Sequence, residues 1–290
     1  MKKKPYADDA EYIEAMMKRF KLVDMRLQYR DIILEAEASS MGYKGFLKRL
    51  LEVEEEGKTC RRTELLKKAA GFESVKRLED IDYSFNPTLD RNRITDLGNL
   101  RFIEAGENVL IIGPPGVGKS MIATGIGIKA VEAGYKVMFV NAKDLVDRLH
   151  DSMLAGTLKE TLEGLGKIPL LIVDELSYVK MDKERESLFF QVIRQRYEKN
   201  SLIVTTNLPM GRWDELFTGR LAATAILDRL VHHCHTMSIT GDSYRVKVLR
   251  GKLRAAETAA YFRRYSLPDC ACGHQTAHNH YDERRASVTC

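Results

Sequence analysis

The sequence predicts an α/β fold, in which a mainly parallel five-stranded sheet is preceded by a small all-helical N-terminal domain. Short apolar runs alternate with helical patterns from residue 107 onward. Runs this apolar are typical of parallel strands that are buried on both faces. A glycine-rich loop follows the first run and leads into a helix. Residues 1–70, in contrast, show only the periodicity of helices.

Composition and charge favour a soluble, cytoplasmic protein of one large or two modest domains. Hydrophobic residues make up 44% of the 290-residue chain, charged residues make up 30%, and the net charge is +5. This mildly basic balance permits nucleic-acid binding without demanding it. Five cysteines, an odd number, argue against a disulfide framework and for a reducing compartment. Neither a signal peptide nor a membrane-spanning run is expected, because the lysine-rich start turns acidic and no long apolar stretch follows.

Residues 1–70 are expected to form a helical domain that binds DNA or a protein partner. Apolar residues recur at helical spacing in three groups: Ile13, Met16, Met17 and Phe20; Leu22, Met25, Tyr29 and Ile32; and Tyr43, Leu47, Leu50 and Leu51. Residues 39–42 and Gly57 predict breaks between helices. A basic cluster consists of Arg61, Arg62, Lys67 and Lys68. It fits either a solvated helix face or a docking surface, and charge alone does not decide between them.

Residues 71–106 are expected to form a connector and a lead-in helix. Residues 78–87 alternate apolar and polar side chains and end at Asn86-Pro87, which predicts an extended segment. Its aromatic residues either pack on the next domain or line a base pocket. A single helix that ends at Ala105-Gly106 is then predicted from the spacing of Leu89, Ile94, Leu97, Leu100 and Ile103.

Residues 107–250 carry the alternation of strands and helices. Strands are predicted at residues 108–112, 136–140, 169–173, 202–206 and 236–239, and helices at residues 143–154 and 184–198. Right-handed crossovers place the loops after the strands at one edge of the sheet, where ligands bind. Residues 251–290 are expected to form a last helix and a disordered tail.

The loop after the first strand matches the phosphate-binding pattern G-x-x-x-x-G-K-[ST]. It consists of Gly113, Pro114, Pro115, Gly116, Val117, Gly118, Lys119 and Ser120, and Met121 follows in the helix. The glycines permit a tight turn whose N–H groups surround phosphate oxygens, and the helix N-terminus adds positive potential. Lys119 is expected to reach the terminal phosphates, and the Ser120 hydroxyl is expected to bind Mg²⁺. Residues 113–121 are therefore the candidate nucleotide contacts.

Polar residues end the third and fourth predicted strands. Asp174 can hold Mg²⁺, and Glu175 is placed to polarise a water for attack on the terminal phosphate. Asn207 can orient that water if the fourth strand lies between the first and the third. Simpler explanations are a helix cap for the acidic pair and a turn with Pro209 for Asn207. The phosphate-binding loop upstream favours the catalytic interpretation.

These residues resemble the Walker A, Walker B and sensor-1 elements of AAA+ ATPases. The stretches at residues 106–110 (Gly-Glu-Asn-Val-Leu) and 223–233 (Ala-Thr-Ala-Ile-Leu-Asp-Arg-Leu-Val-His-His) resemble the IstB-like ATP-binding proteins, helper ATPases encoded beside the transposase in bacterial insertion sequences. The resemblance covers about residues 10–250. It implies ATP and Mg²⁺ as cofactors, a homo-oligomer with ATP between subunits, and duplex DNA and the transposase as partners. The DnaC helicase loaders are also similar, and they act on a replicative helicase and single-stranded DNA.

The resemblance assigns roles to two arginines. Arg229 lies where the family carries an arginine finger, which reaches the ATP of a neighbouring subunit, and Arg245 lies at the sensor-2 position. A guanidinium supplies fixed, always-charged donors for the charge that develops on phosphate. Arg220 is a competing finger candidate, and only the resemblance favours Arg229. The expected catalytic set is Lys119, Glu175, Asn207 and Arg229.

Another activity and two possible metal sites are alternatives to this interpretation. A small-molecule kinase could use the same loop, but no insertion between the loop and Asp174 supplies an acceptor pocket or lid. Residues 232–235 (His-His-Cys-His) are interpreted as structural, because neighbouring residues on a helix point in different directions. The tail could bind zinc adventitiously, although the spacing of its cysteines does not match a C-x₂-C site. The candidate ligands are Cys270, Cys272, His274, His278 and His280.

Overall fold

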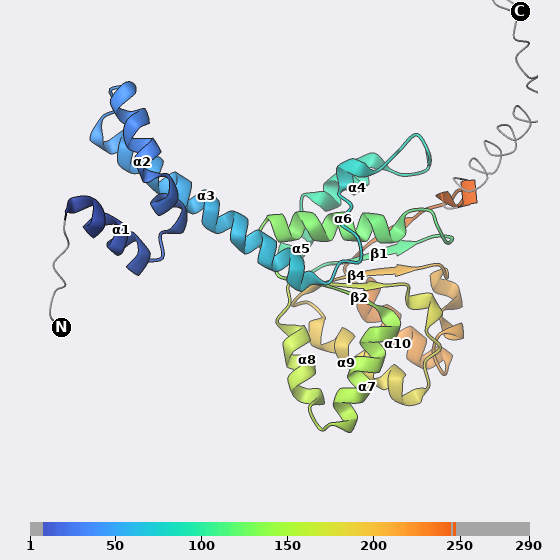
Figure 1. The fold of residues 1–290 in the computed structure, drawn as a ribbon. Coiled ribbons are helices and arrows are strands. Elements are labelled where there is room, and N and C mark those ends of the chain that lie inside the picture. The colour runs from blue at the N-terminus through green and yellow to red at the C-terminus, as the bar shows by residue number, and fades with distance from the viewer. Residues whose placement is uncertain (1–7, 245, 248–290) are drawn as a thin grey trace, which may run out of the picture. The chain divides into compact units, whose positions relative to one another are not determined.

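The computed structural model describes residues 8–244, 246 and 247. Its centre is an all-parallel sheet of five strands in the order β2-β3-β4-β1-β5 (Figure 1). The strands are β1 (Asn108–Ile112), β2 (Val137–Asn141), β3 (Leu170–Asp174), β4 (Ser201–Thr206) and β5 (Cys234–Ser238). All five predicted strands are confirmed. The last one begins earlier than predicted because Cys234 already pairs with Asn108 at the start of β1.

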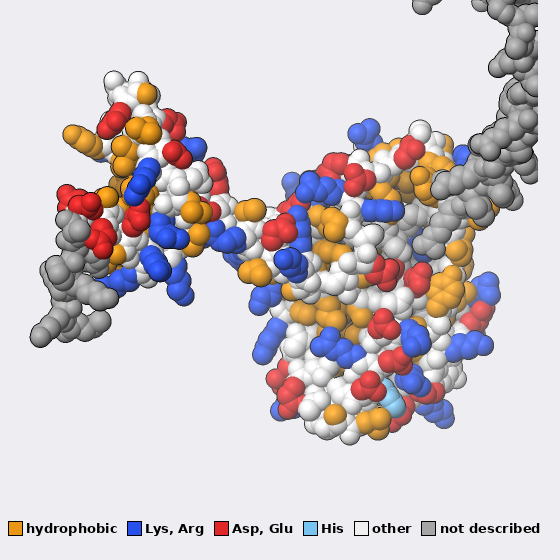
Figure 2. Space-filling view, in the orientation of Figure 1, with side chains coloured by type: hydrophobic (Ala, Val, Ile, Leu, Met, Phe, Trp, Pro, Cys, Tyr) orange, Lys and Arg blue, Asp and Glu red, His pale blue; other side chains and the backbone are white. Residues whose placement is uncertain are grey.

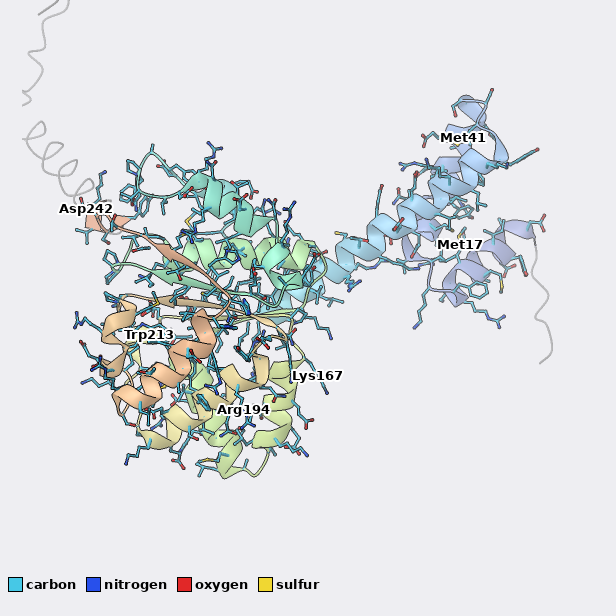
Figure 3. The ribbon with its side chains drawn as sticks, turned by 180° about the vertical axis from the view of Figure 1, so that it is seen from behind. Met17, Met41, Lys167, Arg194, Trp213 and Asp242 are labelled. Carbon is cyan, nitrogen blue, oxygen red and sulfur yellow. The ribbon has the colours of Figure 1, made fainter. Side chains whose placement is uncertain are left out.

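Helices cover both faces of the sheet (Figure 1). One face carries α4 (Arg91–Gly98), α5 (Arg101–Glu104) and α6 (Lys119–Glu132), and the other carries α7 (Ala142–Leu154), α8 (Leu158–Gly166), α9 (Lys183–Arg196) and α10 (Arg220–Val231). Successive strand residues alternate between two cores: Val109 and Ile111 belong to one, and Leu110 belongs to the other. The strands are therefore buried on both sides, which explains the continuous apolar runs of the sequence. Trp213 lies fully buried in the second core (Figure 3).

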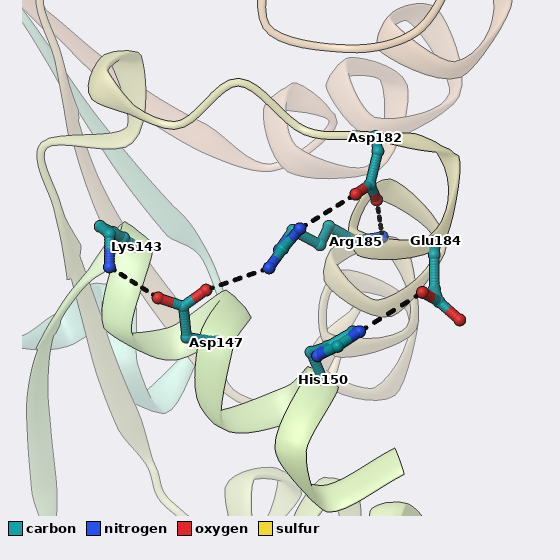
Figure 4. A network of polar contacts seen from close by, with 6 residues as sticks. All are labelled: Lys143, Asp147, His150, Asp182, Glu184 and Arg185. Carbon is teal, nitrogen blue, oxygen red and sulfur yellow. Dashed lines mark hydrogen bonds and ion pairs between the residues drawn. The ribbon is translucent and has the colours of Figure 1, made fainter. Parts of the chain in front are cut away.

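A polar network joins α7 to α9 (Figure 4). Its members are Lys143, Asp147, His150, Asp182, Glu184 and Arg185. The Arg185 guanidinium lies 3.6 Å from Asp147 and 3.0 Å from Asp182, and the Arg185 N–H also donates to Asp182 at 2.8 Å. The hydrogen bond from Lys143 lowers the pKa of Asp147, and the Arg185 backbone N–H lowers that of Asp182. Asp182 thus caps α9, which begins one residue before its predicted start.

The N-terminal region contains α1 (Asp9–Arg19), α2 (Val23–Ala38) and α3 (Tyr43–Ala70). Its core consists of Met25, Tyr29, Ile32, Leu50 and Val53. The break predicted at residues 39–42 is confirmed, whereas the break predicted at Gly57 is wrong, because α3 continues through that position. A Cβ at Gly57 would collide with the carboxyl group of Asp24 on α2. The glycine therefore permits the close approach of two helices rather than ending one.

Glu54 of α3 closes the start of α2. Its Oε2 accepts hydrogen bonds from the backbone N–H groups of Asp24 at 2.9 Å and Met25 at 3.0 Å. Leu22, the residue at the N-cap of α2, offers no side-chain acceptor. A carboxylate from the neighbouring helix thus satisfies two N–H groups that the helix itself leaves without partners. Glu54 is only 3% exposed, so this contact also fixes how α2 and α3 pack.

Part of the basic cluster on α3 is engaged by acidic side chains. Arg61 forms ion pairs with Asp24 and Glu54. Lys67 lies 3.4 Å from Glu132 of α6. These two residues therefore contribute to packing within the protein. Arg62 also donates to the Gly134 carbonyl at 3.4 Å, so the alternative of a docking surface rests more on Lys68 than on the cluster as a whole.

The connector packs against the sheet domain. Leu78, in a short 3₁₀ helix η1 (Leu78–Asp80), occupies the space that a side chain at Gly125 of α6 would need. The ring of Phe85 meets that of Tyr244 edge-on, with 4.8 Å between the ring centroids. Asn86 donates to the Thr240 carbonyl at 2.9 Å. The connector thus packs against the segment that follows β5 and is hydrogen-bonded to it.

The prediction of a single lead-in helix from Leu89 to its end at Ala105-Gly106 is wrong. Leu100 adopts a left-handed backbone conformation, with φ of 63°, and this turn separates α4 from α5. Leu100 remains buried in the same core as Ile94, Leu97 and Ile103. The apolar residues therefore keep the spacing of a continuous helix although the backbone turns at Leu100. For this reason the sequence pattern does not reveal the break.

Two predictions fall outside the described residues. They concern Arg245 and the tail of residues 251–290, with its Cys270, Cys272, His274, His278 and His280. Within the residues that are described, no helix combines the length and the apolar character needed to cross a membrane.

Candidate functional site

The loop of residues 113–120 joins the end of β1 to the start of α6. Gly116 and Gly118 have φ angles of 81° and 102°, which L side chains rarely adopt. Over the described part of the chain, the backbone N–H groups of Gly116, Val117 and Gly118 donate to no backbone acceptor. Such N–H groups beside a helix N-terminus fit a phosphate group.

The side chain of Lys119 folds back over this loop. Its Nζ donates to the carbonyls of Gly113 at 2.8 Å and Pro114 at 2.9 Å, and the residue is 9% exposed. A largely buried ammonium at this position fits the anionic oxygens of a triphosphate. Met121 lies in the first turn of α6 and packs partly buried against the core on that face.

Ser120 and Asp174 meet at the carboxyl edge of the sheet, where the strands end. Ser120 Oγ donates to Asp174 Oδ1 at 3.0 Å, and Asp174 is 5% exposed. Two neighbouring ligands of an octahedral ion with bonds of about 2.1 Å lie about 3.0 Å apart. This pair of oxygens therefore fits a Mg²⁺ ion. Hard oxygen ligands are also the kind that Mg²⁺ prefers.

Thr205 is a member of the site that the sequence analysis missed. Its hydroxyl donates to Asp174 Oδ1 and accepts the backbone N–H of Glu175 at 2.9 Å. The parallel register of β3 and β4, which pairs Val173 with Val204, brings Thr205 beside Asp174. A polar residue just before the end of a buried strand was the available signal.

Glu175 has a partner that the sequence analysis also missed. Asn141 Nδ2 donates to Glu175 Oε2 at 3.3 Å, and the register of β2 and β3 pairs Asn141 with Asp174. The other end of the Asn141 amide caps α7, because Oδ1 accepts the Lys143 N–H at 3.0 Å. Glu175 itself has a positive φ of 57°, which is uncommon for a residue with a side chain. Asn141 of β2 thus holds the carboxylate of Glu175, while Thr205 of β4 holds its backbone N–H.

Asn207 follows directly after β4. This strand lies between β3 and β1, which is the position that the role of Asn207 requires. The Asn207 backbone N–H donates to Ser177 Oγ at 3.2 Å. No side-chain hydrogen bond of Asn207 to another described residue is present, so its amide can bind a water or a phosphate oxygen.

Arg229 lies at the opposite edge of the sheet from the phosphate-binding loop. The carbonyl of the next residue, Leu230, accepts from Asn108 Nδ2 at 3.0 Å, and Asn108 is the first residue of β1. The Arg229 guanidinium stacks over Phe190 at 4.8 Å from the ring centroid and donates to the Ala225 carbonyl at 2.9 Å. Arg229 therefore cannot reach the loop of its own subunit.

Arg220, the competing candidate, is exposed at the other end of α10. At 1.5 Å per residue it lies roughly 14 Å from Arg229 along the helix axis. The two candidates are thus separated in space, although their spacing in the sequence did not distinguish them.

The segment before Arg245 touches the loop. The Tyr244 N–H donates to the Gly116 carbonyl at 2.9 Å. A Cβ at Gly116 would collide with Ser243 Oγ, so only glycine permits this approach. Residues 243–244 therefore lie against the back of the phosphate-binding loop. Asp242, two residues before Tyr244, is labelled in Figure 3.

The parallel sheet, the loop and the acidic pair together define a nucleotide-binding protein of the AAA+ P-loop class. The family model for IstB-like ATP binding protein matches residues 15–252. The chain belongs to this family of IstB-like ATP-binding proteins.

Relatives of the chain come from insertion sequences. The insertion sequence IS21 ATP-binding protein of Pseudomonas aeruginosa is 38% identical over 238 residues, which cover 82% of this chain and 90% of the relative. The IS5376 ATP-binding protein of Geobacillus stearothermophilus is 39% identical over 215 residues, 74% of this chain and 86% of the relative. Among solved structures, DnaI has a TM-score of 0.49 at 22% identity, covering 57% of this chain and 91% of that chain.

Proposed function

We propose that the protein is a Mg²⁺-dependent ATPase that assembles on duplex DNA and assists the transposase of an insertion sequence. The observation that carries the ATPase part is the contact between Ser120 and Asp174 at 3.0 Å, with Glu175 next in the chain and the phosphate-binding loop beside them. The insertion-sequence relatives support the transposition part.

Each residue has a role in the proposed reaction. The loop N–H groups and Lys119 bind the phosphates, and Ser120 and Asp174 hold Mg²⁺, which neutralises phosphate charge when bound. Glu175 accepts a proton from the attacking water, and Asn207 orients that water. Thr205 and Asn141 fix Asp174 and Glu175, respectively. Arg245, which the family resemblance puts at the sensor-2 position, completes the nucleotide contacts in this proposal.

Arg229 acts in trans in this proposal. Its place at the amino edge of the sheet supports the role, because a guanidinium there can contact only the nucleotide of another subunit. The ATP site is then shared between neighbours, so hydrolysis depends on assembly. To act, Arg229 has to leave its contacts with Phe190 and the Ala225 carbonyl.

Binding to duplex DNA is proposed to depend on phosphate contacts from several subunits. On the face seen in Figure 2, Lys and Arg side chains are interspersed with Asp and Glu rather than gathered into one basic band. A subunit that contacts DNA through this face alone is therefore expected to bind weakly, with affinity that falls steeply as salt rises. Residues 1–70 remain the candidate domain for contacts with DNA or the transposase.

The test is phosphate release from ATP, measured with and without duplex DNA. We expect DNA to stimulate release, and Glu175→Gln to slow it at least about tenfold while the variant still binds ATP. Glu163→Gln, a change at an exposed glutamate of α8, is the matched control and should behave like the parent. A phosphorylated small-molecule product without free phosphate would instead identify a kinase.

The partner protein and the kind of DNA distinguish the proposed function from that of a DnaC-like helicase loader. A strand-transfer assay with the transposase of the same insertion sequence should depend on this protein and ATP. Stimulation by single-stranded DNA alone, with no effect on strand transfer, would favour the loader.

A further inference from the structure

Among the described residues, one group of three His, Cys, Asp or Glu side chains lies close enough to share an ion. It consists of Glu198, His232 and His233, whose ligand atoms all lie within 4.8 Å of one another. Glu198 Oε1 is 3.8 Å from His232 Nδ1 and 3.9 Å from His233 Nε2. All three residues are exposed, so an ion can reach them from solvent.

The two histidines converge because the helix ends just before them. α10 stops at Val231, and β5 begins at Cys234. The imidazole rings of His232 and His233 meet edge-on, with 4.2 Å between their centroids. The expectation that neighbouring histidines point in different directions holds for a continuous helix and is wrong at this turn. Cys234 and His235 enter the strand instead and take no part in the group.

The third member comes from a different element. Glu198 lies in the turn between α9 and β4, and its φ of 55° is uncommon for a residue with a side chain. In this backbone conformation, the Glu198 carboxylate faces the imidazole rings of His232 and His233. Such strained positions cluster at functional sites, and here the strain coincides with a set of convergent ligands.

The chemistry of the three groups matches zinc. Zinc prefers imidazole nitrogen and carboxylate oxygen at about 2.0–2.2 Å, which places neighbouring ligand atoms roughly 3.3 Å apart. The distances of 3.8 Å and 3.9 Å therefore need only a small contraction of exposed side chains. The negative end of the α10 dipole lies at the same place and favours a cation.

A hydrogen bond of His232 would compete with zinc for the same ring nitrogen. The Tyr197 hydroxyl is 3.0 Å from His232 Nδ1, the same nitrogen that faces Glu198. This hydrogen bond orients the ring, and zinc bound at Nδ1 would replace it. The Tyr197 ring also lies near the His232 ring, with 6.0 Å between their centroids.

We propose that Glu198, His232 and His233 form a zinc site with open coordination positions. Occupation would tie the end of α9 to the end of α10, the helix that carries Arg229. The proposal does not depend on ATP hydrolysis, because none of the three residues belongs to the nucleotide site.

The test is calorimetric titration of zinc into the full-length protein, after removal of metals by a chelator. The background carries Cys270→Ser and Cys272→Ser, so that tail cysteines contribute nothing. We expect one equivalent of zinc to bind, and Glu198→Gln, His232→Ala and His233→Ala each to lower the affinity at least about tenfold. Cobalt in place of zinc should give the visible absorption of a site with nitrogen and oxygen ligands.

Two further variants keep the result interpretable. His235→Ala removes a nearby histidine that pairs with Glu107 at 2.7 Å, and it should leave zinc affinity unchanged. Tyr197→Phe should leave it unchanged or raise it, because a competing hydroxyl is lost. The circular dichroism spectrum checks that each variant is folded. Equal effects of His235→Ala and His232→Ala, or no effect of the three ligand variants, would overturn the proposal.

Discussion

The amide of Asn141 holds Glu175 and caps a helix at the same time. Nδ2 donates to Glu175 Oε2 at 3.3 Å, while Oδ1 accepts the Lys143 N–H at 3.0 Å. The cap fixes which end of the amide faces Glu175. A hydrogen bond donated to one carboxylate oxygen restricts how the Glu175 side chain can turn. Asn141 is therefore placed to restrain the residue that we propose as the general base.

Asn141→Asp should raise ATP hydrolysis in the absence of DNA a few-fold. Aspartate keeps the oxygen that caps α7 but removes the donor to Glu175 and adds a like charge, which frees the Glu175 carboxylate to turn toward the attacking water. Asn141→Ala should raise hydrolysis similarly and also lower stability by about 1 kcal/mol through loss of the cap. Phosphate release and thermal unfolding check these outcomes. Unchanged basal hydrolysis in both variants would contradict the restraint.

Asp174→Asn should move the Mg²⁺ dependence of phosphate release to higher concentration. The substitution keeps the size of a nearly buried side chain but removes the charge that attracts the ion. Binding of ATP in the presence of a chelator should persist, because the loop and Lys119 are untouched. Titration of Mg²⁺ against phosphate release is the measurement. An unaltered titration curve would show that Asp174 does not bind the ion.

Arg229→Ala and Lys119→Ala should each be inactive alone and regain activity when mixed. In a random equal mixture, about one quarter of head-to-tail contacts join an intact loop to an intact Arg229. Phosphate release from the mixture is therefore expected to exceed that of either variant. Arg220→Ala in place of Arg229→Ala is the matched comparison. Rescue with Arg220→Ala but not with Arg229→Ala would exchange their roles.

Glu54→Ala should destabilise the N-terminal helices by about 1–3 kcal/mol. It removes the carboxylate that accepts hydrogen bonds from two N–H groups at the start of α2, one of them buried and the other partly buried. Urea unfolding followed by circular dichroism measures the loss. Glu56→Ala, at an exposed position of the same helix, serves as the control. Equal stability of the two variants would show that the cap contributes nothing.

Cys234 should react slowly with iodoacetamide at neutral pH, whereas the exposed Cys60 should react readily. Burial raises the pKa of the Cys234 thiol to about 11 from 9.0. Because the folded pKa is the higher one, this group's contribution to stability is complete below pH 9 and is lost as pH rises toward 11. Peptide mapping by mass spectrometry reports both cysteines. Rapid labelling of Cys234 in the native protein at pH 7 would contradict this prediction.

The sequence predicts those parts of the fold and site that depend on local pattern. The loop of residues 113–120 and the strands on either side are contiguous, so spacing alone identifies them. Thr205 and Asn141 are different, because strand register brings them to the acidic pair from distant parts of the chain. Nothing near them in the sequence marks that contact.

The errors have a common physical origin in tertiary packing. Gly57 carries the signal of a helix break, yet its missing side chain makes room for Asp24. Leu100 keeps helical spacing while its backbone turns. The interpretation placed His232 and His233 on a helix, but α10 ends at Val231, and the two side chains converge as a result. In each case the local structure depends on contacts with neighbouring helices and strands, and the local sequence does not reveal those contacts.

The position of Arg229, at the opposite edge of the sheet from the phosphate-binding loop, gives any open array of subunits a polarity. In the proposed assembly, one end has a loop that no arginine completes, and the other end has an arginine without a nucleotide to contact. The two ends are therefore chemically unlike, and subunits can join at one while they leave from the other. The length of such an array along DNA would be set by the timing of hydrolysis.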